Sequence, residues 1–370
     1  MTLGKSSGYF GQLDGLRALS VAAVAWSHWR LSLNWYSDSI VPWGELGVET
    51  FFIISGFLIT GILLDNRSST ARFFVLRQFF ARRFLRIFPL FYAALVILAI
   101  VQAKGVSETW LWHASYLSNV YFYLHGWLGQ LSHFWSLAVE EQFYLGWPLL
   151  MIFLPQRFLL SAILISIFLA PTFEKIMTLA FPNHVAAVTA SVLMPSCLDA
   201  LGIGALLAYG VRKKYPMQRI AFRLLLAGLF GLTCWGVADF PSAFEPWRRL
   251  AGNCVLGWLV YSAAVGFKGP FGWLLQSPPF GYIGKISYGL YVIHNFAISM
   301  CLSLLMLLGH PSWLERGYAI PAFRLLAFIS LTIGLSALSW HLFEKPINNL
   351  KCKFPYPVKD KSNSLAPNGV

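Results

Sequence analysis

Charged residues are scarce in this chain: Asp, Glu, Lys and Arg make up 12% of its 370 residues, whereas 57% are hydrophobic. Soluble globular domains carry roughly 25% charged residues, so this composition excludes an ordinary soluble fold. Cysteine is also scarce, and its five copies show neither disulfide-like pairing nor a C-x-x-C spacing. We therefore interpret Cys197, Cys234, Cys254, Cys301 and Cys352 as small packing residues.

Motifs for metal binding are missing as well. The sequence has no H-E-x-x-H stretch and no group of His and Cys at the spacing of metal ligands. We expect neither a metal site nor a permanently bound cofactor. No repeated half is visible either, although many secondary transporters are built from two related halves.

Long apolar runs are abundant. About 20 apolar residues cross a bilayer as an α-helix, and about ten runs approach this length. The predicted fold class is all-α, a polytopic transmembrane helix bundle, whose fifth run is short enough to be re-entrant. The predicted spans are 14–33, 47–64, 87–104, 134–154, 158–173, 193–210, 221–238, 251–267, 284–308 and 321–342. Residues 10–347 form the predicted transmembrane domain, and 348–370 a short cytoplasmic tail.

The net charge of +13 at first suggests a nucleic-acid partner. When the ten spans are followed in order, however, most Lys and Arg residues fall on the side of the membrane that holds the N-terminus. Segments rich in Lys and Arg stay in the cytoplasm, so both termini are predicted to be cytoplasmic. The excess charge is explained by topology, and we expect the lipid bilayer as partner and no nucleic acid.

Ionisable side chains inside a span are costly to bury, so each one is a candidate functional group. The first span carries Asp14, Arg17 and His28. Arg17 and His28 fall on one helix face, about 16 Å apart along the axis. Asp14 lies one turn from Arg17 and can pair with it. The structural alternative is a snorkelling Arg and a His that bonds a neighbouring helix.

Arg82, Arg83 and Arg86 form a basic cluster at the cytoplasmic start of the third span. Arg82 and Arg86 are predicted to stack on one helix face with Arg83 beside them, as a fork suited to clustered phosphates. Ordinary membrane anchoring by positive charge is the alternative, and it explains Arg72 well enough.

The fourth span opens with an aromatic-rich run that contains Glu140 and Glu141. Glu140 lies about 10 Å below the outer end of this helix, at a depth comparable with that of His28. A buried Glu beside a buried His can hold the imidazole in the tautomer needed for a general base. Alternatively the carboxylate faces a water-filled vestibule, as we expect for at least one of the two.

Three weaker signals remain. Ser55 precedes Gly56 in an apolar helix, and such a small pair usually marks close helix packing. His294 is a second intramembrane imidazole, near the middle of the ninth span. Glu344 ends the tenth span on the cytoplasmic side, where pairing with Lys345 or a basic loop would explain it.

Together these segments resemble the acyltransferase-3 family of bacterial membrane O-acyltransferases. Arg17 and His28 match its R-x10-H signature, and the other matching blocks occur in family order as far as Pro346. These blocks are 52–59 (part of FFxxSGFLIT), 82–89 (RRxxRIxP), 134–148 (FWSLxVExQFYLxWP), 287–294 (SYxxYLxH) and the FExP ending at Glu344. One departure is that Val-Ile precedes His294 where the family pattern has Tyr-Leu.

The resemblance implies a multi-pass enzyme of the bacterial inner membrane. It would move an acyl group, usually acetyl, from acetyl-CoA as co-substrate to a sugar hydroxyl of an exopolysaccharide, O-antigen or lipo-oligosaccharide. Implied catalytic residues are Asp14, Arg17, His28 and Glu140, and the implied donor-binding residues are Arg82, Arg83 and Arg86. Substrate-binding or structural roles are implied for Ser55, Gln142, Tyr144, Tyr291, His294 and Glu344. Some family members carry a fused periplasmic SGNH-type hydrolase domain; without it, this chain works alone or with a separate periplasmic partner.

Two other classes of function compete with this hypothesis. A proton-coupled transporter or flippase would also use internal charges and a central His. A glycosyltransferase would need an acidic or metal site facing water, which the sequence does not clearly contain. The gap from Arg17 to His28 is similar to an extended pantetheine arm, which favours acyl transfer. His28 would then deprotonate the acceptor hydroxyl or accept the acyl group first.

Overall fold

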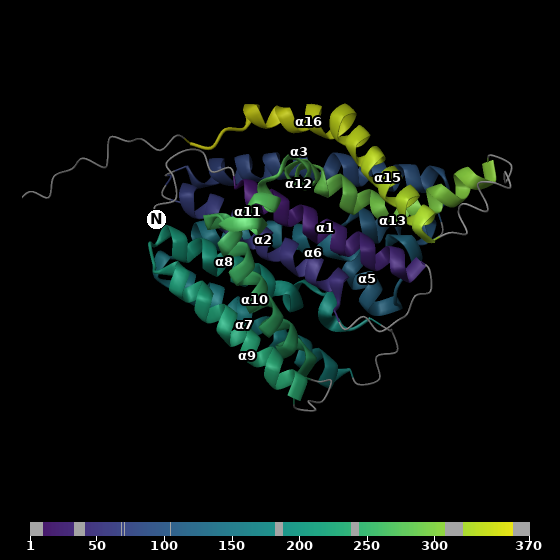
Figure 1. The fold of residues 1–370 in the computed structure, drawn as a ribbon. Coiled ribbons are helices and arrows are strands. Elements are labelled where there is room, and N and C mark those ends of the chain that lie inside the picture. The colour runs from purple at the N-terminus through teal and green to yellow at the C-terminus, as the bar shows by residue number, and fades with distance from the viewer. Residues whose placement is uncertain are drawn as a thin grey trace, which may run out of the picture.

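The computed structural model describes residues 10–32, 41–67, 69, 71–103, 105–181, 188–237, 244–307 and 321–357. All regular secondary structure in this part of the chain is helical, and it contains no strand, which confirms the all-α class (Figure 1). The predicted tail lies outside the described residues from position 358 onward.

The α-helices are α1 (Gly11–Ser32), α2 (Trp43–Asn66), α3 (Arg72–Ile100), α4 (Val106–Ala114), α5 (Ser118–His125), α6 (Phe134–Phe153), α7 (Leu159–Ala180), α8 (Leu198–Arg212), α9 (Met217–Val237), α10 (Glu245–Val265), α11 (Gly269–Gln276), α12 (Pro278–Lys285), α13 (Ser287–Leu307), α15 (Pro321–Ser339) and α16 (Lys345–Asn349). Short 3-10 turns cover Gly129–Leu131, Gln156–Phe158, Ala190–Val192, Met194–Cys197 and Leu350–Lys353. A π-helical turn, η6, joins α15 to α16 over Trp340–Glu344.

Within the described residues, six helices are long and apolar enough to cross a membrane, or seven if α10 and α11 form one span bent by 74°. Three further predicted spans coincide with α1, α6 and α13, which are the helices that carry His28, Glu140 and His294. Each of these helices carries ionisable side chains within its predicted span. The structure therefore confirms a bundle with several candidate spans, whereas the count of ten stays a prediction.

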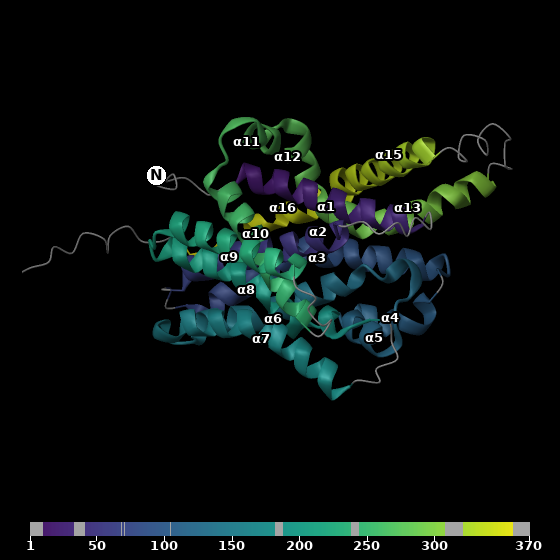
Figure 2. The ribbon, with the colours of Figure 1, turned by 60° about the horizontal axis from the view of Figure 1, so that its bottom comes forward.

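The centre of the bundle is formed by α1 and α2. In the turned view of Figure 2, α11 and α12 lie on one side of these helices, and α4 and α5 on the other. Helix α2 packs backbone to backbone on α8, because a Cβ atom on Gly56 would overlap the carbonyl of Leu201, and one on Gly204 would overlap that of Ile53. The predicted close packing at Gly56 is thus confirmed.

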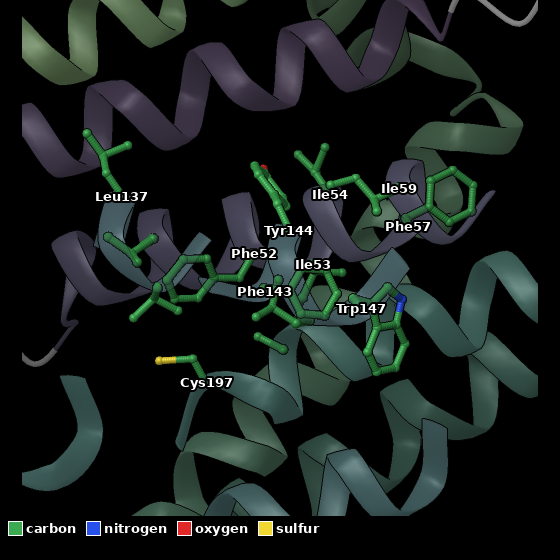
Figure 3. Close-up of a cluster of buried hydrophobic side chains, with 14 of the residues drawn as sticks. Phe52, Ile53, Ile54, Phe57, Ile59, Leu137, Phe143, Tyr144, Trp147 and Cys197 are labelled. Carbon is green, nitrogen blue, oxygen red and sulfur yellow. The ribbon is translucent and has the colours of Figure 1, made fainter. Parts of the chain in front are cut away.

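Large apolar side chains fix α6 against α2 beside this contact. Phe52, Ile53 and Phe143 are almost completely buried, and the ring of Trp147 stacks on Phe143 with centroids 5.0 Å apart (Figure 3). The indole Nε1 of Trp147 donates to Thr60 Oγ1 at 2.8 Å. The only polar hydrogen of this indole is therefore satisfied inside the core.

A buried arginine joins four helices. Arg249 of α10 has its Nη2 2.8 Å from Glu174 Oε2 of α7, and its Nε lies 3.6 Å from Asp199 of α8 and 3.7 Å from Glu49 of α2. Asn253 donates to both Asp199 and Glu49 at 3.1 Å. Helix α7 continues past Glu174 to Ala180 and is long enough to cross a membrane, so the fifth run is longer than predicted. The charge of Glu174, which interrupts the apolar run, is the reason why the predicted span ends at residue 173.

Helix α3 also differs from its predicted span. It begins at Arg72, well before residue 87, and continues without a break through Pro89 to Ile100. The arginines at 82, 83 and 86 consequently lie in the middle of a long helix, where neighbouring helices surround them.

Candidate active site

A narrow polar cavity lies between α1, α2, α3, α6 and α13, with a volume of about 80 Å³. One water needs roughly 10–15 Å³ of such space, so the cavity has room for several waters. Its wall includes both polar and apolar side chains. The polar ones are Arg17, Ser55, Arg83, Arg86, Ser136, Glu140, Tyr144, Ser287, Tyr288 and Tyr291. Sequence blocks that lie far apart in the chain thus meet around one space.

The carboxylate of Glu140 is held in the middle of this cavity. Ser55 Oγ donates to Glu140 Oε1 at 2.6 Å, and the same hydroxyl lies 3.2 Å from Tyr144 Oη. The guanidinium of Arg83 lies over the Tyr144 ring, 5.4 Å from its centroid. Ser55 therefore donates a hydrogen bond to Glu140 and also lies in a helix that packs closely on its neighbour.

Arg17 and Arg86 supply further positive charge to the same space. Arg17 Nη1 lies 2.7 Å from Asp14 Oδ1, so the predicted pairing of these two residues is confirmed. Arg86 lines the cavity, and no described residue forms a hydrogen bond or an ion pair with its guanidinium. Its five N–H donors remain available for an anionic ligand.

Arg82 is turned away from the other two arginines of its cluster. Its Nη1 donates to the carbonyls of Lys351 and Phe354, both at 3.1 Å, and its guanidinium covers the Tyr356 ring. The predicted fork of Arg82 with Arg86 is therefore not formed. The segment after helix α16 supplies the carbonyls that bind Arg82. The sequence pattern alone could not indicate that this segment lies beside α3. Arg83 and Arg86, one turn apart, are the pair that faces the cavity.

His28 does not line this cavity and contacts another imidazole. Its Nδ1 is 3.0 Å from His294 Nε2 and 3.1 Å from the Val24 carbonyl oxygen. The predicted contact between His28 and Glu140 is not formed. His133 is level with His28, their ring centroids being 6.2 Å apart, and Glu140 follows about 10 Å further along α6.

Two hydroxyls connect the cavity with these histidines. Tyr291 Oη lies within hydrogen-bond distance of Ser136 Oγ, and it donates to the His133 carbonyl at 3.2 Å. Ser136 and His133 were missed by the sequence reasoning, although both lie in or beside the aromatic-rich run that opens α6. Their signal was the i, i+3 spacing of His133 and Ser136, which places both on the helix face of Glu140.

Two other predicted residues lie away from the cavity. Gln142 Nε2 donates to the Tyr116 carbonyl and to Asn119 Oδ1, both at 2.8 Å, and so fixes α6 to α5. Glu344 is buried in the π-helical turn, where it accepts from Ser339 Oγ at 2.9 Å beside Gly289. Its predicted ion pair with Lys345 is absent from the described residues. The turn points Glu344 inward, away from the lysine that follows it.

The chain belongs to the acyltransferase-3 family, whose acyltransferase domain matches residues 10–341. It is similar to the O-acetyltransferase OatA of Staphylococcus aureus (strain MRSA252), with 29% identity over 379 residues, which cover 96% of this chain and 60% of that protein. It is also similar to the peptidoglycan O-acetyltransferase OatA of Listeria monocytogenes, with 28% identity over 380 residues, 92% of this chain and 56% of that protein. The chain thus spans less than two thirds of these relatives. No solved structure matches it.

Proposed function

We propose that this protein is an integral-membrane O-acetyltransferase that moves an acetyl group from cytoplasmic acetyl-CoA to a sugar hydroxyl of a cell-surface glycan. One observation carries the proposal: a line of polar side chains runs through an apolar bundle from Arg83 and Arg86, past Glu140 and Tyr291, to His28. Buried ionisable groups persist in a membrane protein where a function uses them.

The arginine end of this line suits the donor. Coenzyme A carries clustered phosphates on a long flexible arm that ends in the thioester. Arg83 and Arg86 provide charge-assisted donors for phosphate, and Arg86 has no protein partner in the described part of the chain. The arm would then follow the cavity outward, where His28 lies about 16 Å along α1 from Arg17.

The histidine end suits the transfer itself. In direct transfer, His28 takes the proton of the acceptor hydroxyl while the oxygen attacks the thioester carbonyl. The new C–O bond forms, the C–S bond breaks, and the leaving thiolate receives the proton from the His28 imidazolium. In the two-step route, His28 attacks the thioester carbonyl first, so that an N–C bond forms and the C–S bond breaks as the thiolate leaves. The acceptor oxygen then attacks the acetyl-imidazole, the N–C bond breaks, and the hydroxyl proton passes to the thiolate. Rapid denaturation near neutral pH during turnover separates the routes, because only the second leaves labelled acetyl on the protein and acid would hydrolyse an acetyl-imidazole.

The acceptor in this proposal is a glycan or lipid-linked sugar at the outer face. The name of the Listeria relative specifies peptidoglycan, which makes peptidoglycan fragments the first acceptor to test. Exopolysaccharide, O-antigen and lipo-oligosaccharide fragments are the next. The enzyme would occupy the bacterial inner membrane through a domain over residues 10–347, alone or with a separate periplasmic partner.

The test uses purified protein in lipid nanodiscs with radiolabelled acetyl-CoA and each class of glycan fragment. We expect alkali-labile acetyl on one class of fragment and release of free coenzyme A. His28→Ala should abolish transfer while the protein inserts at normal abundance. Transfer that persists in His28→Ala would reject the role of this imidazole. Substrate flux in proteoliposomes without any use of acetyl-CoA would instead support a transporter.

A further inference from the structure

The hydrogen bonds of His294 define which of its nitrogens carries the proton. His294 is fully buried on α13, and its Nδ1 lies 2.7 Å from the carbonyl oxygen of Tyr291 and 3.3 Å from that of Leu290. A carbonyl oxygen can only accept, so Nδ1 must be the protonated nitrogen. In the neutral ring, Nε2 then keeps its lone pair and can only accept.

This assignment extends to His28. Its Nδ1 lies 3.0 Å from His294 Nε2 and 3.1 Å from the Val24 carbonyl, and both of these neighbours are acceptors. His28 Nδ1 must therefore carry the proton, which leaves Nε2 as the nitrogen with a free lone pair. No described residue forms a hydrogen bond with this Nε2 atom.

We propose that His294 is a positioning residue that holds His28 in the tautomer whose Nε2 can take a proton or an acyl group. The inference rests on the proposed function, in which His28 is the reacting imidazole. When Nε2 removes the proton of the acceptor hydroxyl, the bond from His28 Nδ1–H to His294 Nε2 becomes charge-assisted and stabilises the imidazolium. The Tyr291 carbonyl is the third member of this series of hydrogen bonds. It accepts from His294 Nδ1 and so keeps the lone pair of His294 Nε2 directed at His28.

His133 does not share this role, although its ring is as close to His294 as that of His28, with centroids 4.9 Å apart in both pairs. Its Nε2 lies 3.2 Å from the Val292 carbonyl oxygen, and its Nδ1 lies 3.4 Å from the side-chain amide nitrogen (Nδ2) of Asn295. Both nitrogens of His133 therefore have partners of their own. His28 Nδ1 has a side-chain acceptor in His294 alone among the described residues.

The kinetic test replaces His294 in two ways in the full-length protein. His294→Phe keeps a planar ring but has no acceptor, whereas His294→Gln carries a carbonyl oxygen at about the reach of Nε2. We expect His294→Phe to lower kcat on the order of 10²-fold while KM for acetyl-CoA stays within about twofold, because loss of general-base assistance removes at least 10² in rate. His294→Gln should recover most of kcat.

His113 on α4 is the matched control. It is also fully buried, its ring nitrogens have no hydrogen-bond partner in the described residues, and burial lowers its pKa to about 4, so it remains neutral. His113→Gln should leave kcat unchanged even if it alters thermal stability. Wild-type kcat in His294→Phe, or equal loss in the Phe and Gln variants at equal abundance, would overturn the positioning role.

A spectroscopic measurement tests the hydrogen bond without turnover. In protein labelled with ¹⁵N-histidine, an Nδ1–H···Nε2 bond between two imidazoles gives a ¹⁵N–¹⁵N scalar coupling. We expect this coupling in the wild type and its loss in His294→Phe and in His28→Ala. Coupling in a wild type that transfers no acetyl group would reject the proposed function and keep the tautomer assignment. An active wild type without coupling would reject the assignment alone.

Discussion

At the scale of single residues, three arginines from one short run have three different surroundings. Arg82 bonds carbonyls of the C-terminal segment, Arg83 lies over the Tyr144 ring, and Arg86 forms no hydrogen bond or ion pair with a described residue. The proposed donor site predicts different outcomes for their replacement. A phosphate contact contributes to donor affinity, whereas a contact to carbonyls contributes to the free energy of unfolding.

Arg86→Gln is expected to raise the Kd for acetyl-CoA by one to two decades, because a charge-assisted hydrogen bond contributes roughly 1.5–3 kcal/mol. Arg82→Gln should lower the unfolding temperature and leave that Kd close to the wild-type value. Arg72→Gln, at the exposed start of α3, serves as control for the loss of one positive charge. Calorimetric titration of the three purified variants provides the comparison. Equal affinities in all three would leave these arginines as membrane anchors.

A second residue-scale prediction concerns Arg249. Removing one partner of a buried ionic group leaves uncompensated charge and costs about 3–5 kcal/mol. Arg249→Met would leave Glu49, Glu174 and Asp199 without their shared cation, so we expect a large loss of folded protein. Fluorescence-detected size exclusion measures that loss. Adding Glu174→Gln and Asp199→Asn to Arg249→Met should restore part of it, and no restoration would argue against the electrostatic cause.

At the scale of elements, contacts between helix backbones limit which substitutions the bundle tolerates. A Cβ on Gly56 would overlap the Leu201 carbonyl, whereas a Cβ on Gly146 of α6 meets no atom within 4 Å. Gly56→Ala should therefore destabilise by about 1–3 kcal/mol through overpacking, and Gly146→Ala should be neutral or stabilising. Thermal unfolding of the two variants in one detergent checks this. Similar unfolding temperatures would mean that α2 and α8 can move apart.

The sequence allowed the prediction of features that depend on spacing along one helix. The Asp14–Arg17 pair and the packing role of Gly56 are of this kind. The contact of His28 with His294 could not be predicted, because it depends on the relative depth of α1 and α13, which only their packing determines. The same holds for Arg82, since a helix wheel gives the face of a residue but not the element that covers that face.

At the scale of the whole molecule, the distribution of Lys and Arg makes a topological prediction. Both termini should lie in the cytoplasm, because positively charged segments are retained there. Fusions of a fluorescent protein and of alkaline phosphatase to the C-terminus measure this directly. Fluorescence without phosphatase activity is expected. An active phosphatase would mean an odd number of spans and would overturn the depths assigned to Glu140 and His294.

The small volume of the cavity also matters for the energy supply of the cell. A bacterial inner membrane maintains a proton gradient, and a continuous file of water between Arg86 and His28 would conduct protons across it. The cavity holds about 80 Å³, and Phe51, Phe52 and Leu137 occupy part of its wall. The hydroxyls of Ser136 and Tyr291, which lie within hydrogen-bond distance of each other, form part of its wall. Such a small space limits a proton leak through the protein.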